Sequence, residues 1–117
     1  MTLNELSDEV FEYAEKQGFH ETPFNFGESL MLIVSELSEA LEADRRGKQF
    51  FINGNPTAIM PKEEYELYVK GTVEEEIADA IIRLCHLAKH KKINLDWHVR
   101  AKMEYNKTRP YKHGKKY

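Results

Sequence analysis

The sequence contains a single cysteine, Cys85, so no two thiols within the chain can form a disulfide. Disulfide frameworks belong to oxidising compartments, and we therefore expect a reducing, cytoplasmic environment. Apolar runs are short, because none approaches the ~20 residues that cross a bilayer, and we do not expect a membrane protein. The first ten residues, MTLNELSDEV, are acidic and lack the basic and apolar regions of a signal peptide.

Internal repeats and low-complexity segments are also missing, which argues against a solenoid. What is present is a globular composition, with 41% hydrophobic and 32% charged residues. A disordered chain would carry fewer apolar residues for this amount of charge. The length of 117 residues suits one domain with a modest core, and we expect a single domain over residues 1–117.

Charge is unevenly distributed along the chain. Residues 102–117 contain six lysines and arginines against one glutamate, a net charge of +5, which leaves −8 on the first 101 residues. An acidic body with a basic tail suits a metal-bound polyphosphate, because acids hold the cation while bases meet the phosphates. A solvated basic end explains the same pattern, and charge alone favours it. Nucleic-acid binding is not expected, because the acidic body would repel a duplex.

Helical periodicity predicts an all-α protein of four to five helices. The first helix is expected over about 2–17, with Gly18 as its stop. A capping box formed by Asn25 and Glu28 opens the second, which runs to about residue 46. The apolar stripe of this second helix has helical spacing and is predicted to be core; it consists of Leu30, Ile33, Val34, Leu37 and Leu41.

A second capping box, Thr72 with Glu75, opens a third helix that extends to about residue 91. Its predicted core stripe consists of Ile77, Ala78, Ile81, Leu84, Cys85 and Ala88. A fourth helix is expected from about 94 or 96 to 107, followed by a basic tail over about 108–117. The segment 48–71 interrupts the pattern with a brief extended piece at 50–52, a turn at 53–56 and a short helix near 61–69 closed by Gly71.

Two acidic pairs lie beside the predicted stripes. Glu36 and Glu39 lie about 60° apart at the margin of the stripe on the second helix, and Glu76 and Asp79 repeat this arrangement on the third. Two antiparallel helices would bring the four carboxylates together, as an all-oxygen site for Mg²⁺ or Mn²⁺. Similar pairs occur elsewhere in the sequence and are usually solvated helix faces, so both interpretations remain open.

Three ordered segments, SELSEALEADRRGK, EEEIADAIIRL and KMEYNKTRPYKHGKKY, carry a resemblance to a known family. Together they resemble the MazG-like branch of the all-α nucleoside triphosphate pyrophosphohydrolases, a group that includes dimeric dUTPases and dCTP pyrophosphatases. The resemblance implies a MazG-like helical bundle that forms a homodimer or homotetramer. It also implies hydrolysis of a nucleoside triphosphate between the α- and β-phosphates.

The resemblance extends to individual residues. The family's Mg²⁺ ligands, for which Mn²⁺ can substitute, match Glu36, Glu39, Glu76 and Asp79. The family's phosphate-contacting positions match Lys102, Asn106 and Arg109, with Tyr105 beside them. We nominate Glu36 as the catalytic residue that orients or deprotonates the attacking water. His20, Phe24 and Phe26 lie where the family gathers nucleobase contacts, although loop phenylalanines more often belong to the core.

Other interpretations remain beside this one. The connection between Glu39 and Glu76 is longer than the family pattern, so the segment 48–71 leaves the base and sugar of the substrate open. A non-catalytic module that binds nucleotides or proteins would also keep the fold. His86 and His90 are expected to be exposed near a helix end, Cys85 to lie in the core, and Trp97 to pack.

Overall fold

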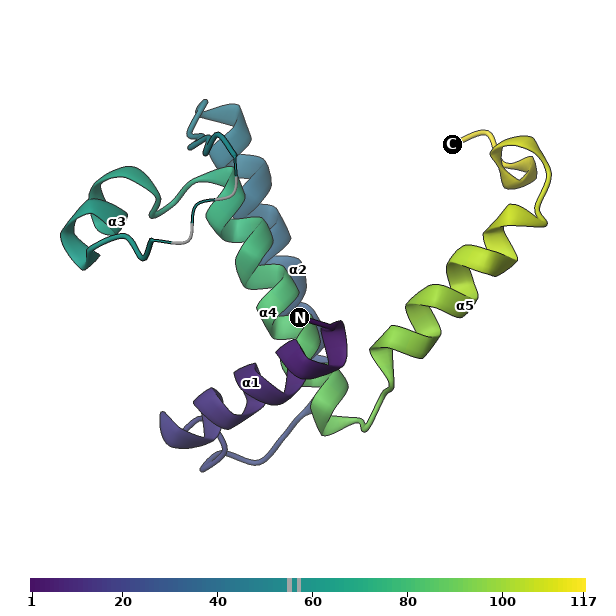
Figure 1. Ribbon diagram of the computed structural model, residues 1–117, viewed down its shortest axis with the longest axis horizontal. Coiled ribbons are helices and arrows are strands. Elements are labelled where there is room, and N and C mark those ends of the chain that lie inside the picture. The colour runs from purple at the N-terminus through teal and green to yellow at the C-terminus, as the bar shows by residue number, and fades with distance from the viewer. Residues whose placement is uncertain (55, 57) are drawn as a thin grey trace. The chain divides into compact units, whose positions relative to one another are not determined.

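The computed structural model describes residues 1–54, 56 and 58–117. These residues form five α-helices, a final 3₁₀ turn and no strand, which confirms the predicted all-α class (Figure 1). None of the described helices combines the length and apolarity that a bilayer crossing requires. The helices are α1 (Leu3–Lys16), α2 (Phe26–Arg45), α3 (Lys62–Tyr68), α4 (Val73–His90) and α5 (Leu95–Lys107), followed by η1 (Tyr111–Gly114).

Side-chain caps determine where the two longest helices begin. The Asn25 Oδ1 accepts the N–H of Glu28 at 2.9 Å and opens α2. The Thr72 Oγ1 accepts the N–H of Glu75 at 3.3 Å and opens α4. These bonds satisfy backbone donors that have no partner inside a helix, and both predicted capping positions are confirmed.

The chain divides into two compact units. Unit 1 comprises Met1–Phe19 and Cys85–Tyr117, and unit 2 comprises His20–Leu84. Helix α4 therefore begins in unit 2 and ends in unit 1. The acidic pairs belong to unit 2, whereas α1, α5 and the basic tail belong to unit 1.

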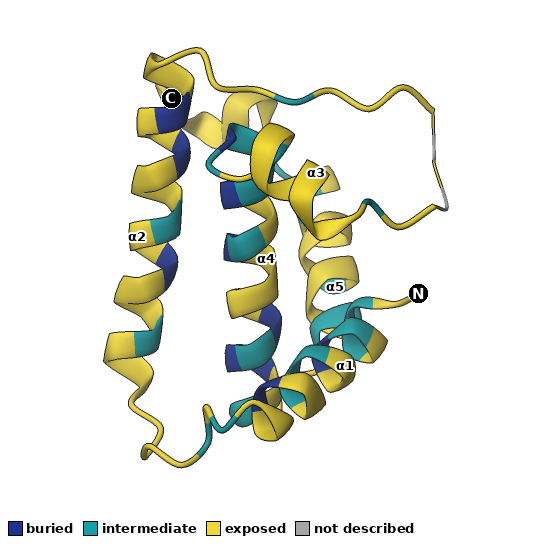
Figure 2. Cartoon of the chain, turned by 90° about the vertical axis from the view of Figure 1, so that its left-hand side faces the viewer, coloured by how far each residue is buried: buried dark blue, intermediate teal, exposed yellow. Residues whose placement is uncertain are grey.

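In unit 2, α2 and α4 run antiparallel with their buried residues facing one another (Figure 2). Three contacts establish this direction. As the residue number increases along α2 and just beyond it, the residue number of the partner on α4 decreases. These contacts join Glu36 to Arg83, Glu39 to Glu76, and the carbonyl of Lys48 to the N–H of Val73 at 3.0 Å. The buried residues of this helix pair are mostly small, and they are Ile33, Ala40, Ala43, Glu76 and Ala80.

The prediction that the large apolar stripes form the core is wrong for most of their residues. Seven of these side chains are between 40% and 53% exposed: Leu30, Val34, Leu37 and Leu41 on α2, and Ile77, Ile81 and Leu84 on α4. Ala78 is exposed as well, whereas Ile33, Cys85 and Ala88 are buried as predicted. The helices approach one another through the alanine-rich line that also carries the acids, because small side chains allow close approach. The larger side chains lie about 110° away around each helix.

In unit 1, reciprocal polar contacts join the starts of α1 and α5. The Asp96 carboxylate accepts the N–H groups of Leu3 and Asn4 at 2.9 and 3.1 Å. The Asn4 side chain donates to Asn94 Oδ1 at 2.8 Å, and Asn94 itself caps α5. One helix start therefore caps the other, which a sequence pattern does not reveal because these residues are about ninety positions apart.

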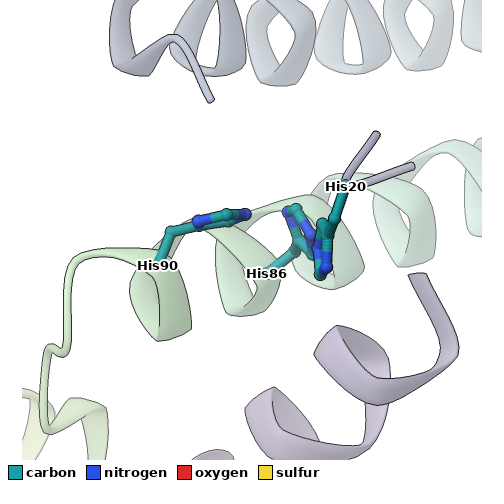
Figure 3. Close-up of side chains that lie close together, drawn as sticks. All are labelled: His20, His86 and His90. Atoms are coloured by element: carbon teal, nitrogen blue, oxygen red, sulfur yellow. The ribbon is translucent and has the colours of Figure 1, made fainter. Parts of the chain in front are cut away.

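The histidines near the end of α4 are half-buried, so the prediction that they are exposed is wrong (Figure 3). His86 and His90 lie on consecutive turns, with ring centroids 4.8 Å apart. The Phe11 ring stacks on His86 at 5.6 Å and meets His90 edge-on at 4.9 Å. This aromatic packing explains their burial. Trp97, by contrast, is exposed, and its predicted packing role is wrong.

The segment 48–71 contains α3 and has no other regular secondary structure among its described residues. The piece at 50–52 forms no strand, and the predicted turn at 53–56 includes residue 55, which lies outside the described residues. The predicted short helix is confirmed as α3. Gly71 follows it with a φ of 78°, a left-handed conformation that favours glycine.

Candidate metal centre

Three carboxylates converge between α2 and α4. One oxygen each from Glu36, Glu76 and Asp79 lies within 4.8 Å of the others. Glu36 is on α2 between the buried Ile33 and Ala40, and helical spacing directs it toward α4. Glu76 and Asp79 are three residues apart on the facing side of α4. The antiparallel pairing therefore brings together acids from both predicted pairs.

The sequence placed these acids at the margin of the apolar stripes, but the structure buries them more deeply than such a position would. Glu76 is only 8% exposed, and the Glu36 side chain is 13% exposed. Glu76 Oε2 has no hydrogen-bond partner among the residues that the structure describes. An uncompensated carboxylate oxygen in such a position is costly, because buried polar groups normally have a partner.

The electrostatics of the cluster oppose its own ionisation. Burial first, followed by hydrogen bonds with Glu39 and Glu36, raises the pKa of Glu76 to about 7. Burial and then the charge of Glu36 also raise the pKa of Asp79. A group of acids that holds protons this tightly is a site where a cation would be favourable.

Glu39 belongs to the edge of the cluster. Its carboxyl hydrogen-bonds to Glu76, but it is exposed and is not among the three closely grouped oxygens. Glu42, one turn further along, is ion-paired with Arg46 at 2.9 Å on the exposed face. Its side chain is 51% exposed, so Glu42 lies on a solvated face and does not belong to the cluster.

Arg83 is a member of the cluster that sequence reasoning did not assign. Its Nε donates to Glu36 Oε1 at 2.8 Å, and it also opposes the rise in the pKa of Asp79. Its position seven residues after Glu76 and four after Asp79 places it on the same face of α4, which was the available signal. The ion pair compensates part, but not all, of the negative charge.

Tyr65 is the second residue that sequence reasoning missed. A hydrogen bond to Glu75 first, followed by burial and by the charges of Glu75, Asp79 and Glu76, raises the pKa of Tyr65 to about 12. The hydroxyl of this α3 residue therefore lies next to the acids of α4. No pattern within 48–71 indicated this contact, because it joins two helices through tertiary packing.

The residues present fit a hard divalent cation. The cluster offers carboxylate oxygens from Glu36, Glu76 and Asp79, with Glu39 at its edge. Mg²⁺ prefers oxygen ligands and is commonly held by one or two carboxylates and several waters. The unpartnered oxygen of Glu76 would gain a ligand bond, and the repulsion that raises its pKa would be relieved.

The predicted phosphate-contacting residues form a separate group in unit 1. Lys102 Nζ lies 4.9 Å from the Tyr105 ring centroid, and Arg109 Cζ lies 5.8 Å from it. Asn106 Oδ1 is buried with no partner in the described part of the chain. Helix α5 ends at Lys107, as predicted, so Arg109 lies just beyond the helix. The Arg109 N–H nevertheless bonds the carbonyl of Asn106 at 3.1 Å.

The three residues predicted to contact a nucleobase lie at the start of unit 2. His20 is half-buried, and the Phe24 and Phe26 rings meet edge-to-face with centroids 6.5 Å apart. Both phenylalanines are exposed, so the favoured assignment to the core is wrong. They form an aromatic pair on the surface, just before and at the start of α2.

No protein-family model, no curated protein and no solved structure significantly matches this chain. The sequence motifs and the geometry of the acid cluster are therefore the basis for a functional conclusion. Neither depends on the placement of one unit against the other, because Glu36, Glu39, Glu76 and Asp79 all belong to unit 2.

Proposed function

We propose that this protein is a Mg²⁺-dependent nucleoside triphosphate pyrophosphohydrolase, for which Mn²⁺ can replace Mg²⁺. It would convert a nucleoside triphosphate to the monophosphate and pyrophosphate. The observation that carries the proposal is the convergence of Glu36, Glu76 and Asp79, together with the buried Oε2 of Glu76 that has no partner among the described residues. The ordered motifs that resemble the MazG-like enzymes support the choice of reaction.

In this proposal the acidic residues have different roles. Glu36, Glu76 and Asp79 would hold Mg²⁺, and Glu39 would support Glu76 through their hydrogen bond. When bound, Mg²⁺ supplies positive charge that offsets the charge developing on the phosphate oxygens. Arg83 keeps Glu36 oriented through its ion pair and limits the repulsion within the cluster.

Glu36 is the proposed general base. It would accept a proton from a water molecule as the water oxygen forms a bond to the α-phosphorus. The bond from that phosphorus to the oxygen bridging to the β-phosphate breaks, and pyrophosphate leaves with the electron pair. The resemblance assigns contacts with phosphate oxygens to Lys102, Asn106 and Arg109, with Tyr105 beside them.

The products test this reaction directly. Turnover in water enriched in ¹⁸O is expected to give a monophosphate that carries the label and an unlabelled pyrophosphate, because attack occurs at the α-phosphorus. Mass spectrometry of the separated products makes the distinction. Label in pyrophosphate, or formation of diphosphate and inorganic phosphate, would contradict the proposed bond cleavage.

A second copy of the chain is the proposed partner. On both α2 and α4, the exposed apolar stripe lies about 110° around the helix axis from the buried line, measured in the direction of increasing residue number. Because the two helices are antiparallel, both stripes therefore lie on the same side of the helix pair. The seven side chains, each 40–53% exposed, form one continuous apolar face of the kind that a dimer interface covers. Two such faces would form a four-helix dimer core, on which a tetramer could build.

Charge in this apolar face should therefore prevent association. Leu37→Lys or Ile81→Lys is expected to convert the dimer to a monomer at micromolar concentration, because a buried lysine would have no counter-charge. Light scattering after size exclusion measures the mass. Leu67→Lys, on the exposed side of α3, is the matched control and should leave the dimer intact. A wild-type chain that is monomeric at these concentrations would refute the interface.

A non-catalytic nucleotide-binding or protein-interaction module is the second candidate. The Arg83–Glu36 ion pair favours it, because it partly satisfies the acids without any metal. Such a module would have no need for the unpartnered oxygen of Glu76. Folded protein that shows no turnover of any nucleotide in Mg²⁺ would favour this candidate.

A further inference from the structure

A pair of histidines lies at the end of α4, within unit 1 and apart from the acid cluster. His86 and His90 are four residues apart, so both rings project from the same side of the helix (Figure 3). Their ring centroids lie 4.8 Å apart, and a ring nitrogen of one lies within 4.8 Å of a ring nitrogen of the other. The proposed reaction uses neither residue.

Aromatic packing restrains the two rings. Phe11 of α1 stacks on His86 and meets His90 edge-on, at centroid distances of 5.6 and 4.9 Å. Both histidines are half-buried, whereas His98 and His113 are exposed. Side chains that are already restrained lose less conformational entropy when they bind a ligand, so this pair is preorganised for binding.

The separation of the ring nitrogens is close to the one that a transition metal requires. Zn–N bonds of about 2.0–2.1 Å place two donor nitrogens about 3.4 Å apart on a tetrahedral ion. A small rotation of either ring would reach this separation. Two histidines at i and i+4 on one helix face bind zinc in known metalloenzymes. Imidazole nitrogen suits Zn²⁺, Ni²⁺ and Cu²⁺, whereas the carboxylate oxygens of the acid cluster suit Mg²⁺.

The charges around the pair partly oppose a cation and partly favour it. Lys89 and Lys92 line the same open groove as His90, and Asp8 offsets the charge of Lys89 through an ion pair at 2.6 Å. His90 is the last residue of α4, where the aligned carbonyls make the end of the helix negative. Lysine charges on flexible side chains are screened by water, so the coordinate bonds to the imidazoles decide the balance.

We propose that His86 and His90 form a binding site for a borderline divalent metal ion, of which Zn²⁺ is the representative. The two ring nitrogens would supply two ligands, and water in the groove beside His90 would complete the coordination. The ion would stabilise the last turn of α4, because it joins side chains on consecutive turns. The site differs from the acid cluster in its position and in its ligand atoms, and it does not depend on the proposed function.

Calorimetric titration of the intact chain with Zn²⁺, in buffer that contains saturating Mg²⁺, tests the site. We expect one Zn²⁺ to bind at the histidine pair, Cu²⁺ to bind more tightly than Zn²⁺, and zinc to raise the melting temperature by about 5 °C. NMR spectra of protein labelled with ¹⁵N-histidine should show that zinc shifts the ring nitrogens of His86 and His90 and leaves those of His98 unchanged.

Phenylalanine is the informative replacement, because it keeps an aromatic ring against Phe11 and has no donor nitrogen. His86→Phe and His90→Phe are each expected to weaken Zn²⁺ binding at least ~100-fold, since a lost ligand costs more than a lost outer-shell partner. Each should also abolish the increase in melting temperature. His98→Phe, at an exposed position on α5, is the matched control and should change neither result.

Unchanged zinc affinity in His86→Phe and His90→Phe would overturn the proposal, and so would ring nitrogens of the wild type that do not respond to zinc. Zinc binding that is lost in Glu76→Gln and kept in the phenylalanine variants would place the ion at the acid cluster instead. No detectable binding of Zn²⁺ or Cu²⁺ at millimolar concentration would also refute the site.

Discussion

Replacing Glu76 by Gln is expected to lower pyrophosphate release at least ~100-fold and, in the absence of metal, to raise the melting temperature by about 5 °C. The two effects have one cause. In the proposed reaction the buried carboxylate holds the metal, but without metal it is a charge held against Glu36 and Glu39. An amide of the same size removes the charge and keeps the packing. Initial rates in Mg²⁺ and thermal melts in EDTA measure both effects.

Glu42→Gln is the matched control for this substitution. Glu42 is also a glutamate of the α2–α4 pair, but its carboxylate contacts Arg46 on the exposed face. Its removal should leave the rate unchanged and should not stabilise the metal-free protein. A Glu76→Gln protein that keeps full activity would contradict the assignment of this residue, and one that melts lower in EDTA would contradict the electrostatic argument.

Stability without metal is expected to fall as pH rises from about 5 to about 7.5. The pKa of Glu76 is raised from its ordinary value of 4.5 to about 7, so over this interval the folded chain binds more protons than the unfolded chain. Stability then decreases with pH, and it becomes level once Glu76 is ionised in both states. The raised pKa of Asp79 acts in the same direction.

Melting temperatures from pH 5 to 8 in EDTA, for the wild type and for Glu76→Gln, isolate this contribution. The variant serves as the reference because both chains share every other titrating group. Mg²⁺ should stabilise the wild type more at pH 8 than at pH 5, since protons compete with the metal for the same oxygens. Wild-type and variant curves that run parallel would show that Glu76 does not titrate in this range.

Local patterns were sufficient to predict the helices. Asn25 and Thr72 cap α2 and α4 where the sequence places them, and the acids of the two pairs meet between these helices. Capping and periodicity depend on residues within one or two turns, which explains why a sequence reveals them.

Which face of a helix is buried within its own chain could not be predicted. The Leu37 stripe is the strongest amphipathic signal in α2, yet the line through Ile33 and Ala40 packs on α4. An apolar stripe indicates burial against some partner and does not specify whether that partner is the same chain or another copy. Alanines add little to the pattern, although they allow the close approach that buries Glu76.

Contacts over long sequence separations were also beyond the sequence. Tyr65 meets Glu75 only because α3 folds back on α4, and Asp96 caps α1 from the far end of the chain. No short-range periodicity encodes such pairs. The placement of the segment 48–71 against α4 depends on the same kind of packing, and for that reason the sequence indicated this segment but not its architecture.

Pyrophosphate release from a panel of canonical and modified ribo- and deoxyribonucleoside triphosphates, with Mg²⁺ and with EDTA, tests the central claim most directly. We expect release that requires Mg²⁺ or Mn²⁺, with equimolar monophosphate. Absence of release from every nucleotide by folded protein in saturating Mg²⁺ would contradict the claim that Glu36, Glu76 and Asp79 form a catalytic metal centre.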